Sequence, residues 1–149
     1  IKKDGNVIGS EIIGQNFSKK GYFVSRPSAA GNNGYDTSSS GGSNMAPTSK
    51  ALLDRVSAKE KELHKRFDGG NIPSDLVLAS GSGLDPDISK NAAMFQIDTI
   101  AKERGIKSKE VASVIESLSK SKILGILGED RVNVLKLNLA LDAKFGQMK

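Results

Sequence analysis

Residues 89–105 read SKNAAMFQIDTIAKERG, and this stretch predicts a helix with both of its ends marked. Ser89 precedes it and can accept a hydrogen bond from a free N–H group of the first turn. Gly105 follows it and suits the left-handed conformation at which many helices end. The apolar side chains that recur at helical spacing are Ala93, Ile97, Ile100 and Ala101. One face of this helix is therefore expected to be buried.

Three further segments carry helical patterns. The clearest covers residues 49–67, where Thr48 or Ser49 can cap the first turn. Its apolar stripe, interrupted at Glu60, comprises Leu52, Leu53, Val56, Leu63 and Phe67. Another helix is expected to begin at the cap Ser108, and a last one to span residues 137–145.

Short apolar runs bounded by glycine or turn residues predict strands. They are Val7-Ile8, Ile12-Ile13, Tyr22-Phe23-Val24, residues 75–79, residues 123–128 and residues 132–135. Together with the helices they predict an α+β fold: a small sheet of short strands, three to four helices and long Gly/Ser-rich loops. The length of 149 residues is typical of one domain, so residues 1–149 are expected to form a single unit.

Composition excludes several classes of function. The chain has no Cys and one His, His64, which rules out thiol catalysis, Cys-ligated zinc and a His pair on a metal. Its net charge of +5 would suit nucleic acid, but acidic residues are interspersed throughout and aromatic residues are scarce, so no nucleic-acid partner is expected. No window of 18 apolar residues is present, and the start at Ile1 leads us to expect a removed segment upstream, such as a signal or an anchor.

Residues 31–44 are mostly Gly, Ser and Asn, a composition typical of a flexible linker. Within them, Ser40-Gly41-Gly42-Ser43 resembles the core of the signature loop of ATP-binding-cassette transporters, although the lysine of a P-loop is absent. From the residues alone, a linker, a phosphate-binding loop and a shaped structural loop all remain open.

The remaining candidates for chemistry are weak. Asp85 and Asp87 could act as paired carboxylates, but LDPDIS is better explained as a turn followed by a helix start. Ser82 lies between two glycines without the strand–turn–helix context of a nucleophilic serine. No catalytic residue and no metal ligand is therefore assigned, and the chain is expected not to be an enzyme.

Four blocks of sequence, taken in order, carry a family resemblance. They are GSEIIGQNF (9–17), RPSAAGNNGYDTSSSGGSN (26–44), IPSDLVLASGSGLDPDIS (72–89) and LGILGEDRVNVLKLNLALD (124–142). The chain resembles the C subunit of Kdp, the high-affinity potassium-transporting P-type ATPase. It departs from the family pattern at Met45-Ala46 and at Asp87, where a histidine is common.

The resemblance implies an extracytoplasmic domain that follows one N-terminal membrane helix, in a single-pass protein of the cell membrane. It implies three partners: a channel-like A subunit, an ATP-hydrolysing B subunit and a small F subunit. Two roles have been suggested for such subunits: a catalytic chaperone that raises the ATP affinity of the B subunit, and an assembly factor or cap near the outer mouth of the potassium pathway.

We expect a non-catalytic accessory subunit whose glycine-rich loops dock onto its partners. The residues assigned to the partner interface are Arg26, Tyr35, Asp36, Ser82, Gly83 and Asp85. The alternative is direct nucleotide binding by Ser40, Gly41, Gly42, Ser43 and Asn44. No cofactor is expected to bind tightly, and ATP would act through the complex. A positive domain would repel potassium unless acidic groups such as Asp85 and Asp87 faced the pathway.

Overall fold

The computed structural model describes residues 1–3, 5–120 and 128–148. It is an α+β structure, as predicted, in which helices dominate. The helices are α1 (Lys50–Arg66), α2 (Lys90–Phe95), α3 (Ile97–Arg104), α4 (Ser108–Leu118) and α5 (Val134–Phe145), with a 3-10 turn at Ser74–Leu76. The strands are β1 (Lys2–Lys3), β2 (Asn6–Val7), β3 (Asp87–Ser89) and β4 (Arg131–Asn133), which form two antiparallel pairs, β1–β2 and β3–β4.

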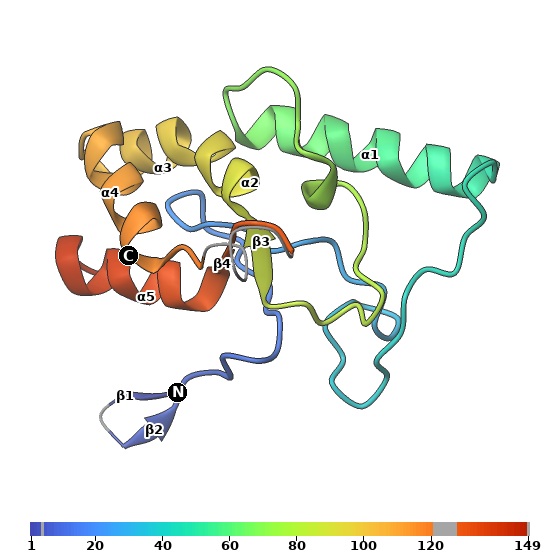
Figure 1. The fold of residues 1–149 in the computed structure, drawn as a ribbon, viewed down its shortest axis with the longest axis horizontal. Coiled ribbons are helices and arrows are strands. Elements are labelled where there is room, and N and C mark those ends of the chain that lie inside the picture. The colour runs from blue at the N-terminus through green and yellow to red at the C-terminus, as the bar shows by residue number, and fades with distance from the viewer. Residues whose placement is uncertain (4, 121–127, 149) are drawn as a thin grey trace.

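The core lies mainly among α2, α3, α4, α5 and the β3–β4 pair, which form the left half of Figure 1, and Leu63 and Phe67 at the end of α1 join it. In the strand pair, Ile88 of β3 lies opposite Val132 of β4, and both are buried. The helices add fully buried side chains from three elements: Ile100, Val111, Ile115, Leu137 and Leu141. α1 crosses the upper right of the same view, and the β1–β2 hairpin projects below the body.

The predicted helix at residues 89–105 is two helices. Its start and end are confirmed, because the Ser89 side chain accepts a hydrogen bond from Ala92 N and Gly105 adopts φ 66°. The break falls at Gln96, whose N–H bonds to Ala93 O instead of continuing the α-helical ladder. Gln96 is fully buried, and its Oε1 accepts Val24 N at 2.8 Å. A tertiary contact of this kind leaves no periodic signal in the sequence.

The strand predicted at Tyr22-Phe23-Val24 is wrong, and two buried amide side chains explain why. Asn138 accepts the Phe23 N–H at 2.8 Å and donates to Phe23 O at 3.0 Å. Gln96 bonds both the N–H and the carbonyl of Val24 in the same way. These side chains satisfy the backbone groups that a neighbouring strand would otherwise satisfy.

Other boundaries also differ from the predictions. Residues 75–79 are not a strand but begin in the 3-10 turn, Ile12-Ile13 lies in no strand, and only Val7 of Val7-Ile8 belongs to β2. The strand predicted at residues 132–135 ends at Asn133, whose side chain caps α5 by accepting Lys136 N at 3.0 Å. The strand predicted at residues 123–128 falls mostly on residues 121–127, outside the described residues.

Of the two caps predicted for α1 and α4, the one at Ser49 is confirmed and the one at Ser108 is wrong. Ser49 caps α1 by accepting Leu52 N. Ser108 is the first residue of α4, not its cap, and its hydroxyl donates to Asp98 at 2.6 Å. Helix α5 begins three residues earlier than residues 137–145 predicted. In the described part of the chain, no helix combines the length and the apolar character that crossing a bilayer requires.

Candidate functional site

Residues 26–44 and 80–85, here called the loop cluster, are joined by the hydroxyl group of Ser28. That hydroxyl donates to Gly83 O at 2.6 Å and accepts Tyr35 N at 2.7 Å and Ala30 N at 3.1 Å. One donor and two acceptor positions are the whole hydrogen-bonding capacity of a serine side chain. Ser28 therefore connects three backbone segments, although the sequence reasoning did not select it.

A second connection lies between Ser82 and residues 40–41. Ser82 O accepts Gly41 N at 2.8 Å and the Ser40 hydroxyl at 3.1 Å. Gly83 has φ 67°, and a Cβ built there would lie 2.6 Å from Gly41 O and 2.7 Å from Ala30 N. Only glycine fits this position without displacing the backbone. The segment at residues 35–44 is therefore a shaped loop whose conformation depends on residues 80–85.

Tyr35 turns the chain back within the loop cluster. It has φ 57°, rare for a residue other than glycine, and its hydroxyl donates to Arg26 O at 2.7 Å. Burial, followed by the nearby negative charge of Glu62, raises the pKa of Tyr35 to about 12. The exposed Asp36 carboxylate accepts the Ser38 hydroxyl and N–H, and these hydrogen bonds lower the pKa of Asp36.

Arg26 and Asp85 form an ion pair at 3.1 Å on one flank of the loop cluster. Asp85 Oδ1 also accepts Asp87 N at 3.0 Å, which confirms the predicted turn. Asp87 lies in β3, where it pairs with Arg131 at 3.2 Å and accepts Asn133 Nδ2 at 3.1 Å. Because each carboxylate has an arginine partner, the two do not form an uncompensated negative patch.

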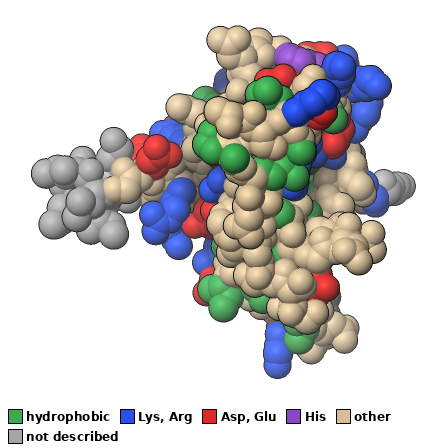
Figure 2. Space-filling model, turned by 90° about the vertical axis from the view of Figure 1, so that its right-hand side faces the viewer, with side chains coloured by type: hydrophobic (Ala, Val, Ile, Leu, Met, Phe, Trp, Pro, Cys, Tyr) green, Lys and Arg blue, Asp and Glu red, His purple; other side chains and the backbone are tan. Residues whose placement is uncertain are grey.

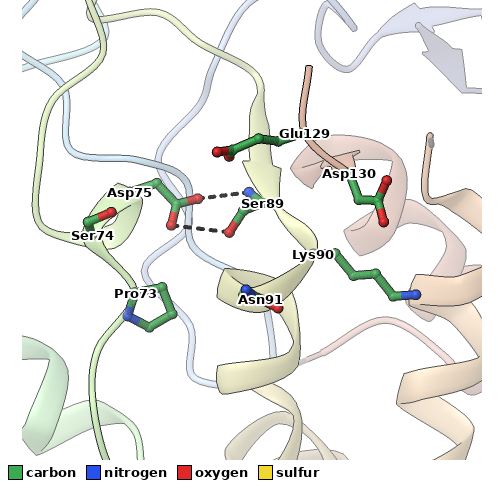
Figure 3. A pocket seen from close by; sticks show the side chains of 8 residues that line it. All are labelled: Pro73, Ser74, Asp75, Ser89, Lys90, Asn91, Glu129 and Asp130. Carbon is green, nitrogen blue, oxygen red and sulfur yellow. Dashed lines mark hydrogen bonds between the residues drawn. The ribbon is translucent and has the colours of Figure 1, made fainter. Parts of the chain in front are cut away.

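A hollow of about 500 Å³ lies beside the start of α2, and Figure 3 shows the side chains that line it. Asp75 points to Ser89 there: its carboxylate accepts Ser89 N at 2.7 Å and the Ser89 hydroxyl at 3.2 Å. Lys90 points away from that pair and forms an ion pair with Glu116 at 2.7 Å. These contacts hold the 3-10 turn against β3, so a structural role accounts for Asp75 and Ser89.

Candidate residues for chemistry are dispersed. His64 is exposed on α1, while the Ser82 hydroxyl accepts Leu84 N at 3.1 Å. Across residues 1–3, 5–120 and 128–148, no group of three or more His, Cys, Asp or Glu residues could hold a metal ion.

The structure brings most of the proposed interface residues together. Arg26, Tyr35, Ser82, Gly83 and Asp85 all belong to the bonded loop cluster, and Asp36 lies on its exposed edge. Among the proposed nucleotide-binding residues, Ser40 and Gly41 face Ser82, so the Gly41 N–H is already bonded. Gly42 and Ser43 line a separate hollow of about 500 Å³, and Asn44 is exposed with φ 51°.

Arg55 of α1 is the second residue that the sequence reasoning missed. Its Nη2 donates to Ser28 O at 3.0 Å, so α1 is tied to the loop cluster. Arg55 also lines the hollow beside Gly42 and Ser43. It lies next to the apolar stripe of a highly charged helix, where one arginine among many charges gives no distinct signal.

Residues 1–143 match the family model described as "KdpC: K+-transporting ATPase, c chain". Among curated relatives, the potassium-transporting ATPase KdpC subunit of Citrifermentans bemidjiense is 50% identical over 140 residues, which cover 94% of this chain and 74% of that protein. The KdpC subunit of Acidobacterium capsulatum is 51% identical over 142 residues, covering 95% of this chain and 76% of the relative. The chain therefore belongs to the KdpC family, the c chain of K⁺-transporting ATPases.

Proposed function

We propose that the chain is a non-catalytic accessory subunit of a potassium-transporting ATPase and that the loop cluster docks onto its partner subunits. The observation that carries this proposal is the interlocking of residues 26–44 with residues 80–85 through Ser28 and Ser82. Small residues bonded to one another in this way form a defined surface, and surface loops on a packed scaffold are suited to recognition. Figure 2 looks onto the side where these loops lie, and neutral polar groups and backbone cover much of that face.

The partners in this proposal are the channel-like A subunit, the ATP-hydrolysing B subunit and the F subunit. The domain lies outside the cytoplasm, attached through a single membrane helix upstream of the described chain. In that location it cannot touch cytoplasmic ATP, so a rise in the ATP affinity of the B subunit would be transmitted through docking. A role in collecting potassium receives no support from Asp85 and Asp87, because both are paired with arginine.

The test is to express the complex with and without this chain, and with Gly83→Val in place of the natural residue. We expect loss of assembly, or loss of potassium-stimulated ATP hydrolysis, in both cases. Gly81→Val is the matched control, because a Cβ at Gly81 meets nothing within 4 Å. Unchanged assembly and unchanged hydrolysis without the chain would exclude an accessory role.

A second candidate is direct nucleotide binding by Ser40–Asn44, favoured by the hollow that Gly42 and Ser43 share with Arg55. Titration of the protein with ATP at physiological salt decides it. Specific binding would disappear in Gly41→Asp and Gly42→Asp variants. Weak binding that is equal in all three proteins would reflect attraction to a chain of net charge +5.

A further inference from the structure

Arg55 differs from the other arginines of the chain in how few of its donors are used. A guanidinium group has five N–H donors. The other four arginines have a carboxylate partner or several carbonyl partners: Arg26 with Asp85, Arg131 with Asp87, Arg104 with Asp142, and Arg66 with four backbone carbonyls. Within the described residues, the Arg55 side chain makes one hydrogen bond, to Ser28 O.

The side chain of Arg55 borders open space on two sides. The residue is half-buried on α1 and lines two hollows, one of about 440 Å³ and one of about 500 Å³. The bond from Nη2 to Ser28 O orients the planar group, and Ser28 is itself held by three hydrogen bonds. An oriented guanidinium loses less conformational freedom when it binds a ligand.

The nearby charges leave Arg55 without compensation. Lys59 is paired with Glu62 at 2.7 Å and Lys50 with Asp54 at 2.6 Å, so those pairs are locally neutral. Among the described residues, no carboxylate lies within ion-pair distance of Arg55. Arg55 therefore leaves one uncompensated positive charge at this position. One positive charge balances one carboxylate, whereas a triphosphate carries several negative charges.

The two hollows differ in their suitability for an anion. The smaller one is lined by both Lys59 and Glu62, which pair with each other, so a carboxylate entering it would have to compete with Glu62 for the nearby positive charges. The larger one has neutral polar walls, contributed by Asn32, Asn33 and Ser43 together with glycine backbone, and Arg55 is the charged residue among its lining groups. Asparagine amides and serine hydroxyls can donate further hydrogen bonds to an acceptor.

We propose that the larger hollow is a carboxylate-binding site in which Arg55 binds the side chain of one Asp or Glu residue from a partner subunit. The fork of the guanidinium holds the carboxylate through two parallel hydrogen bonds, and the neutral wall adds no charge that would repel it. The identification of the partner as a subunit rests on the proposed accessory function. Through this site, α1 and the loop cluster would bind the same partner subunit, with Arg55 as the residue they share.

The test measures the affinity of the chain for the rest of the complex with Arg55→Gln, Arg55→Lys and Lys61→Gln. We expect Arg55→Gln to weaken binding by about tenfold or more, because the partner's carboxylate loses its charge-assisted bonds. Arg55→Lys keeps the positive charge but loses the forked pair of donors, so its affinity for the complex should lie between those of wild type and Arg55→Gln. Lys61→Gln removes an equal charge from an exposed position of the same helix and should have little effect.

A cross-link identifies the bound group. In the assembled Arg55→Lys complex, a water-soluble carbodiimide should join the introduced amine to the adjacent carboxylate, and mass spectrometry of the peptides should place the link at position 55. Thermal unfolding of each variant separates lost binding from lost folding. Arg55→Lys, which retains a donor near Ser28 O, keeps the test informative if Arg55→Gln fails to fold.

Three outcomes would overturn the site. The first is equal binding by wild type and Arg55→Gln, and the second is equal loss in Arg55→Gln and Lys61→Gln, which indicates general charge attraction. The third is ATP binding by the protein alone that requires Arg55, which would assign the hollow to a nucleotide. If the wild-type chain does not bind the complex at all, the accessory function itself fails, so the two failures are distinguishable.

Discussion

The helical half of the molecule and the loop cluster are stabilised by different forces. The helical half, α2 to α5 with β3 and β4, buries aliphatic side chains such as Ile100 and Leu137 completely. The loop cluster buries little apolar surface and depends on hydrogen bonds among serine, glycine and the backbone. Apolar burial tolerates repacking, whereas a hydrogen-bonded loop needs particular atoms at particular positions. Small chemical changes in the loop cluster should therefore alter the shape of the surface proposed for docking while leaving the helical half folded.

Leu137→Ala should have the largest effect, because it empties a fully buried site in the helical half. Truncation of a buried leucine costs about 2–5 kcal/mol in the free energy of unfolding, which denaturant unfolding measures. Leu53→Ala is the control, since Leu53 is 60% exposed and should change stability by about 0.5 kcal/mol or less. Equal losses at the two positions would refute the assignment of the core to the helical half.

Asn138→Ala should follow, because it leaves the buried backbone groups of Phe23 without their partner. An unsatisfied buried polar group costs about 1–3 kcal/mol, so we expect a loss near 2 kcal/mol in the same experiment. The amide exchange rate of Phe23 N–H should rise more than that of amides in α4. A stable variant with unchanged exchange at Phe23 would show that the contact contributes little.

Gly83→Ala tests the loop cluster directly. The left-handed conformation costs a residue with a Cβ about 1–2 kcal/mol, and the added methyl group would also crowd Gly41 O. We expect the hydrogen bond from Gly41 N to Ser82 O to weaken, with faster amide exchange at Gly41 and little change in the helices. Gly81→Ala, in open space, should leave exchange at Gly41 as it is. Global unfolding by Gly83→Ala would mean that the two regions are not independent.

The pH dependence contributed by Tyr35 should be the smallest effect. Its pKa in the folded protein is about 12, above the ordinary value of 10.0, because burial disfavours the phenolate. The folded state therefore binds the proton more tightly, and this stabilisation is complete below pH 10 and lost as pH rises toward 12. Because the ring is partly exposed, we expect this stabilisation to contribute roughly 1 kcal/mol to the free energy of unfolding. Unfolding free energies of wild type and Tyr35→Phe should have different slopes between pH 10 and 12, and parallel slopes would contradict the assignment.

Local patterns predicted the helices well, for reasons that particular residues illustrate. Ser49 and Ser89 act as caps and Gly105 as a helix end, because these roles depend on atoms within one turn of the chain. The periodic stripe of α3 is buried as expected, since Ile97, Ile100 and Ala101 all lie in the core. The stripe of α1 is only partly buried, since Leu63 and Phe67 lie in the core while Leu53 remains exposed. Spacing identified the helix but not how much of its length the core covers.

The candidate site was predicted by resemblance more than by composition. Arg26, Tyr35, Ser82, Gly83 and Asp85 were selected because family blocks contain them, and the structure brings them together. Composition alone suggested a linker at residues 31–44. Ser28 and Arg55 were missed because a serine beside a proline and an arginine in a charged helix are common, and only their partners make them distinctive.

The amino-acid sequence by itself determined the fold class, the helix ends marked by Ser49, Ser89 and Gly105, and membership of the KdpC family, because these depend on neighbouring residues or on long matching blocks. Tertiary structure decided the break at Gln96, the absence of a strand at Phe23 and Val24, and the joining of residues 26–44 to residues 80–85. Each of those features is a hydrogen bond between residues far apart in the chain. Such bonds depend on segments that are close in the folded molecule but distant in sequence, so no local pattern encodes them.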